Sequence, residues 1–144
     1  GFERIFLGSP KQSQYALGQL ARLAQARRLF ADPVFAQRFA ALRLDVLDLS
    51  AAYTGFADIV RAGQPLPASV SLLKIWASET YHRIGALLVE AGEEQGAVAG
   101  DQLLDGQSFN VLSPLIGSTA AMIYGGTNEI QRNILARQVL DLPA

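Results

Sequence analysis

The stretch that decides the fold is residues 32–63, DPVFAQRFAALRLDVLDLSAAYTGFADIVRAG. Asp32 and Pro33 are typical of an N-cap followed by the first residue of a helix, and Gly63 with Pro65 is typical of a helix end. Apolar side chains recur between these signals in alternating steps of four and three residues. They are Phe35, Phe39, Leu42, Val46, Leu49, Tyr53, Phe56 and Val60. This spacing predicts a long helix that buries one face against partner helices.

A second long helix is predicted over residues 69–94, where apolar residues again share one side. The predicted inward residues are Leu73, Trp76, Ala77, Thr80, Ile84, Leu87, Leu88 and Ala91. An earlier helix runs up to about Leu29 and buries Leu17, Leu20 and Ala24. Its start is open, because it begins either near Pro10 or, with a kink at Pro10, within residues 2–7.

The end of the chain predicts two shorter helices after a glycine-studded connection, residues 92–110. The first covers residues 112–123 and is expected to break near Pro114. The second begins near Thr127, with Asn128 and Gln131 as a capping box. Its expected inward residues are Ile130, Ile134, Leu135 and Val139. With no alternating strand pattern, the sequence predicts an all-α, up-and-down four-helix bundle without a sheet, as a single domain over residues 1–144.

The composition argues against several classes of function. Twelve basic and 13 acidic residues give a net charge of −1, which provides neither a nucleic-acid footprint nor a basic membrane patch. No apolar run reaches the roughly 18–20 residues of a membrane-spanning helix. A single histidine, His82, and the lack of cysteine argue against a metal site and disulfides. The lack of cysteine also fits the expected cytoplasmic location.

The most distinctive motif lies at the end of the chain, IYGGTNEIQRNILARQVLDLP, residues 123–143. Gly125 and Gly126 remove side chains just before a helix whose first N–H groups point outward. Thr127 adds a hydroxyl group to this turn. Such a turn suits a phosphate or a planar cofactor, but a glycine pair also simply makes a tight entry into a capped helix. The residues alone leave both interpretations open.

This motif resembles the C-terminal signature of acyl-CoA dehydrogenases, which reads Tyr-(Glu or Gly)-Gly-Thr, a polar run and Ile-Gln-Arg. The resemblance implies an all-α C-terminal domain, with the family's N-terminal helical and β-barrel domains expected to be absent from this chain. It also implies FAD as cofactor and an acyl-CoA substrate, which a carboxylate base and the flavin convert to trans-2-enoyl-CoA. Electron-transfer flavoprotein is the implied acceptor, and a homo- or hetero-oligomer, such as a tetramer, is the implied assembly.

The resemblance also assigns roles to residues of this chain. Many members carry the catalytic glutamate where this sequence has Gly125, and a smaller branch places it in a Glu-Arg-aliphatic run on the first helix. Glu3, in Glu3-Arg4-Ile5, is therefore the expected base. The expected flavin contacts are Arg27, Phe30, Gln37, Gly125, Gly126, Thr127 and Glu129, the first three toward the flavin of a neighbouring subunit.

Alternative interpretations remain for these residues and for the whole chain. Arg27 is equally suited to capping a helix C-terminus, Phe30 to the core, and Glu3 to an ordinary surface ion pair. The chain as a whole is alternatively a non-catalytic helical interaction module, or the subunit of a hetero-oligomeric dehydrogenase that has lost its base.

Overall fold

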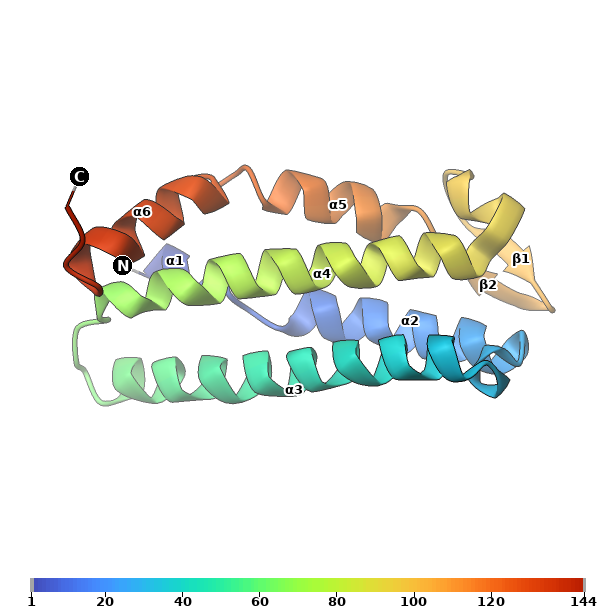
Figure 1. Ribbon diagram of the computed structural model, residues 1–144, viewed down its shortest axis with the longest axis horizontal. Helices are drawn as coiled ribbons and strands as arrows, with labels where there is room; N and C mark the ends of the chain where they lie inside the picture. Colours follow the sequence, from blue (N-terminus) through green and yellow to red (C-terminus); the bar gives the residue numbers. More distant parts are fainter. Residues whose placement is uncertain (1, 144) are drawn as a thin grey trace.

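The computed structural model describes the backbone of residues 2–143 and the side chains of residues 5–143. Its helices are α1 (Phe2–Leu7), α2 (Lys11–Ala26), α3 (Pro33–Arg61), α4 (Ser71–Gly92), α5 (Ser113–Ala121) and α6 (Asn128–Gln138). Short 3₁₀ turns cover Leu29–Ala31, Ala68–Val70 and Glu93–Ala97. Helices α2, α3 and α4 form three rods of a bundle, and α5 and α6 follow each other along the fourth (Figure 1). The predicted all-α bundle is confirmed.

Helix α3 begins and ends where the sequence predicts. The Asp32 side chain accepts a hydrogen bond from the Val34 backbone N–H at 2.9 Å, and Pro33 occupies the first turn, where its missing N–H costs nothing. The helix ends at Arg61, and Gly63 follows with a φ of +70°. The predicted face is fully buried at Phe35, Leu42, Val46 and Leu49, and its other members are partly buried.

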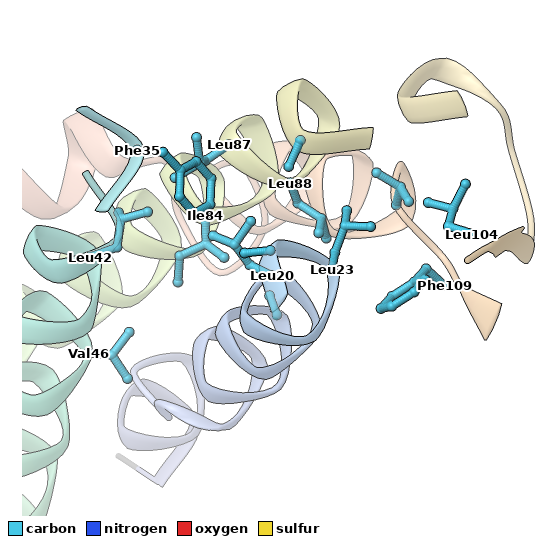
Figure 2. Packing of buried hydrophobic residues seen from close by; sticks show 14 residues of the cluster. Leu20, Leu23, Phe35, Leu42, Val46, Ile84, Leu87, Leu88, Leu104 and Phe109 are labelled. Atoms are coloured by element: carbon cyan, nitrogen blue, oxygen red, sulfur yellow. The ribbon is translucent and has the colours of Figure 1, made fainter. Parts of the chain in front are cut away.

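Helix α4 is the central rod, because it contacts α2, α3, α5 and α6. One apolar cluster joins its C-terminal half to α2, to the start of α3 and to the segment after α4 (Figure 2). The fully buried members of this cluster are Leu20, Leu23, Ile84, Leu88 and Val111, among others. A second cluster, which includes Leu49 and Leu73, joins the other half of α4 to α1 and α3. Because α4 packs against its neighbours on several sides, it fixes the positions of α5 and α6, which flank the candidate site.

The first segment consists of two helices rather than one kinked helix, because α1 ends at Leu7 and α2 begins at Lys11. Gly8 lies directly against α4, and a Cβ at this position would meet the Leu73 Cβ at 2.4 Å. The break at Gly8 and Pro10 therefore lets α1 cross α4 closely. This break places α1 beside the C-terminal turn described below.

The expectation of no sheet is wrong for the connection after α4. Strands β1 (Gln102–Leu104) and β2 (Gln107–Phe109) pair antiparallel, with Leu104 opposite Gln107. Their two-residue loop, Asp105-Gly106, has positive φ at both positions, as a type I′ hairpin requires. Leu104 and Phe109 are buried in the core, so the hairpin closes that end of the bundle. No helix within residues 2–143 is long and apolar enough to span a membrane.

Two details of the last helices also differ from the prediction. Pro114 lies in the first turn of α5 and does not break it, because a proline there loses no helical hydrogen bond. Of the residues expected to face inward, Ile130 in α6 and Val139 just after it are exposed, whereas Ile134 and Leu135 are partly buried. The buried residues of α6 are instead two polar ones, Asn128 and Gln131. This helix is therefore held by a polar network rather than an apolar stripe.

Candidate functional site

The turn between α5 and α6 contains the glycine pair. Gly125 and Gly126 have φ values of +69° and +87°, a region that side chains disfavour, so glycine is the residue that fits both positions. The turn is closed by the Asn128 N–H, which donates to the Met122 carbonyl at 3.2 Å. Thr127 is the N-cap of α6, because its hydroxyl accepts a hydrogen bond from the Ile130 N–H at 3.3 Å.

The predicted capping box at Asn128 and Gln131 is wrong by one residue. Thr127 occupies the N-cap position, and the Asn128 side chain turns into the protein toward α4. Gln131 instead donates through Nε2 to the Gly125 carbonyl at 3.2 Å. Both amide side chains therefore fix the position of the turn.

The surface around the turn is apolar and open. Tyr124 is 48% exposed, Ile130 is 51% exposed and Ile123 is 63% exposed, and both glycines are exposed between them. Apolar side chains around a bare backbone and a helix N-terminus suit a planar ligand that has an apolar face and a polar edge.

Helix α1 lies directly against the turn. A Cβ at Gly125 would meet the Leu7 Cδ1 at 2.3 Å. A pocket of about 270 Å³ opens beside this contact, between Phe6, Leu7, Ser13, Ser78 and Tyr124. Glu3 lies one helical turn before Leu7 on α1, but its side chain lies outside the described residues. The fold thus brings the helix that carries Glu3 to the glycine turn.

A buried polar network beneath the turn was not predicted from the sequence. The Lys74 ammonium on α4 donates to the Met122 carbonyl at 3.0 Å and to the Asn128 Oδ1 at 2.7 Å. Asn128 in turn donates to the Ser78 hydroxyl and to the Glu79 carboxylate, which also pairs with Arg132. Burial lowers the pKa of Lys74, and the nearby carboxylates oppose that shift. The available signal was a lysine and a serine four residues apart within an otherwise apolar part of α4.

Glu129 lies on the outer side of this turn, in the first turn of α6. Its carboxylate is exposed, and hydrogen bonds from its own backbone N–H and from the Thr127 hydroxyl lower its pKa. A negative charge at this place also interacts favourably with the helix dipole. The fold thus brings Glu129 and the predicted contacts Gly125, Gly126 and Thr127 into one turn.

The other three predicted flavin contacts lie away from this turn, where α2 leads into α3 (Figure 1). Arg27 donates to the Ala91 carbonyl and to Gln95, each at 3.1 Å, so it caps the C-terminus of α4. Phe30 is 38% exposed and packs edge-on against Phe35 and Phe39. Gln37 is exposed on α3.

Within one chain, these three residues therefore do not lie near the glycine turn. Their separation is compatible with contact to a neighbouring subunit. That contact stays a prediction.

Comparison with known proteins agrees with the fold and the motif. Residues 2–140 match the family model described as "Acyl-CoA dehydrogenase, C-terminal domain". Acyl-CoA dehydrogenase IpdE1 of Mycolicibacterium smegmatis is 32% identical over 145 residues, covering 99% of this chain and 34% of that protein. Acyl-CoA dehydrogenase IpdE1 of Mycobacterium tuberculosis is 30% identical, covering 99% of this chain and 36% of that protein.

The chain belongs to the acyl-CoA dehydrogenase family. Its residues 2–140 correspond to the C-terminal domain of that family. The resemblance inferred from the sequence is thereby confirmed. The chain spans about a third of the length of the curated relatives it matches.

Proposed function

We propose that this chain is the C-terminal part of an FAD-dependent acyl-CoA dehydrogenase, in which two other domains complete the active site. In this assignment α1 supplies the catalytic base, Glu3, and the turn at Gly125–Glu129 supplies one wall of the flavin site. The observation that carries the proposal is the contact between Leu7 and Gly125, because it brings these two elements together. Acyl-CoA dehydrogenases are oxidoreductases that generally depend on FAD.

The residues of the turn fit a flavin. Two glycines leave its backbone bare, and Tyr124 and Ile130 offer apolar surface that a bound ring would cover. The Thr127 hydroxyl and the first N–H groups of α6 provide polar contacts for the edge of the ring. Flavin, when bound, accepts the hydride that leaves the β-carbon of the substrate. The chain's own part is to hold the ring and to exclude water from it.

The base acts on the neighbouring carbon. The Glu3 carboxylate removes the proton from the α-carbon of the acyl-CoA thioester. Gly125 carries no carboxylate, so this position contributes backbone rather than a base. The pocket beside Leu7 and Tyr124, which polar residues such as Lys11 and Gln12 also line, gives room next to α1 for part of the substrate.

Assembly is the second part of the proposal. An exposed groove of about 620 Å³ between α2 and α3 is lined by Phe30 and Phe39, near the predicted cross-subunit residues. Apolar surface of this kind favours association with further chains. It supports a homo- or hetero-oligomer. The family resemblance, and not the groove, is the ground for expecting a tetramer and electron-transfer flavoprotein as the acceptor. The groove equally suits the alternative of a base-less subunit, in which a partner chain supplies the proton acceptor.

A single substitution in the complete enzyme distinguishes these alternatives. Glu3→Gln keeps the shape of the side chain and removes its basicity, so turnover of acyl-CoA falls by about 10²–10⁴-fold while FAD stays bound. Glu94→Gln is the matched control, because Glu94 is exposed near the other end of the bundle. Near-full activity of the FAD-loaded Glu3→Gln enzyme would show that the base lies elsewhere, and would favour the base-less subunit.

A further inference from the structure

Lys74 is a buried charge in the first turn of α4, beneath the glycine turn. It is 3% exposed, on the central helix α4. Removing an ammonium group from water is costly unless hydrogen bonds replace its hydration. The Lys74 ammonium group donates hydrogen bonds to the Met122 carbonyl and the Asn128 side chain, which lie at the two ends of the glycine turn.

Within the turn, one backbone hydrogen bond, from the Asn128 N–H to the Met122 carbonyl, closes the loop around the two glycines. Glycine has the greatest conformational freedom of any residue, and Gly125 and Gly126 are adjacent and exposed. Further constraints on the turn come from side chains of α4 and α6 that lie beneath it. Lys74 holds both ends of the turn, and Gln131 holds the Gly125 carbonyl from within α6.

The network also explains why the position is polar. Asn128 joins Lys74 to Ser78 and Glu79, so its amide group is satisfied on both sides. Replacing a whole buried polar network by apolar residues is often neutral or stabilising, whereas replacing Lys74 alone leaves the Met122 carbonyl and the Asn128 Oδ1 without its ammonium group. A buried polar network of this kind can serve to select one conformation. The conformation selected here is that of the turn.

We propose that Lys74 is the positioning residue of the cofactor turn. By holding Met122 and Asn128 it fixes Gly125, Gly126 and Thr127 in the arrangement that receives the flavin ring. Lys74 does not contact the flavin and acts through the turn. This inference rests on the proposed function, because it assigns the purpose of the network to FAD binding.

The test compares FAD binding with stability in the complete dehydrogenase. Lys74→Met keeps the length and burial of the side chain and removes every donor. The affinity of the apoenzyme for FAD, measured by fluorescence titration, is expected to fall by about tenfold. Amide hydrogen exchange across residues 123–130 is expected to accelerate, because the turn samples more conformations.

Two further variants separate positioning from general destabilisation. Leu88→Ala opens a cavity in the core near the other end of α4 and lowers the melting temperature without weakening FAD binding. Asn128→Ala removes the second member of the pair and weakens FAD binding in the same direction as Lys74→Met. Both residues act through one network. The affinity of the double variant for FAD should therefore be only slightly lower than that of whichever single variant binds FAD more weakly.

The outcomes are distinct. A wild-type enzyme that fails to bind FAD overturns the proposed function and this inference with it. A wild-type enzyme that binds FAD, with Lys74→Met within about twofold of it, overturns the inference alone. If Lys74→Met does not fold, Asn128→Ala decides by the same criterion. FAD binding that falls equally in Leu88→Ala also overturns the inference, since general destabilisation then accounts for the effect.

Discussion

A methyl group added at Gly125 tests whether α1 and the glycine turn are packed as the structure shows. Gly125→Ala has two separable costs. The positive φ of +69° costs about 1–2 kcal/mol for a residue with a Cβ. The new Cβ would lie 2.3 Å from the Leu7 Cδ1, so Leu7 must leave its rotamer, at about 0.5–1.5 kcal/mol. The expected loss of unfolding free energy is therefore about 1.5–3.5 kcal/mol.

Gly63→Ala is the matched control for the backbone term. Gly63 has a φ of +70°, and a Cβ there meets nothing within 4 Å. The Gly63→Ala variant should lose only about 1–2 kcal/mol of unfolding free energy, measured for the same chain by urea denaturation. The excess loss at Gly125 should disappear in a Leu7→Ala background, giving a coupling of about 1 kcal/mol in the double-mutant cycle. Equal losses at the two glycines, or strict additivity with Leu7→Ala, would refute the packing.

The same contact bears on catalysis. A carboxylate placed at position 125 by one substitution must displace the end of the Leu7 side chain, which occupies the space of its Cβ. In the Glu3→Gln enzyme, Gly125→Glu should therefore restore more turnover when combined with Leu7→Ala than alone. Equal activity with and without Leu7→Ala would show that Leu7 does not limit this position.

Three further outcomes are expected. Asp32→Ala should lower the unfolding free energy by about 1 kcal/mol, seen in urea denaturation, because the cap of α3 is lost. The pKa of Glu129 is held below its ordinary value of 4.5, so its contribution to stability is complete above that pH and is lost as the pH falls through the lower value of the folded chain. Denaturation between about pH 3 and 6 should therefore show a shallower acid dependence in Glu129→Gln. The isolated chain should self-associate in sedimentation experiments and should not retain FAD through gel filtration, because one wall of a site does not bury the cofactor.

The helical part of the fold was predictable from the sequence because its signals are local. The apolar period of α3 and the cap at Asp32 need no knowledge of the partner helices. The hairpin was missed although Asp105-Gly106 is a strong signal for a two-residue loop. Its strands are only three residues each, too short to show an alternating pattern.

The site was predictable only in part, for a physical reason. The glycine turn is recognised from neighbouring residues, but the network beneath it joins Lys74 to Asn128 across 54 positions of sequence. Periodicity assigns faces from hydropathy and therefore placed Ile130 inward, whereas hydrogen bonding buries Asn128 and Gln131 instead. The approach of α1 to Gly125 likewise depends on how the helices pack.

The most direct test of the central claim is a structure of the complete dehydrogenase with FAD and an acyl-CoA bound. We expect a Glu3 carboxylate oxygen to lie about 3–3.5 Å from the α-carbon of the thioester. We also expect the Thr127 hydroxyl to lie within about 3 Å of a polar atom of the flavin. A flavin bound away from the turn, or a thioester that Glu3 does not approach, would show that the proposed site is wrong.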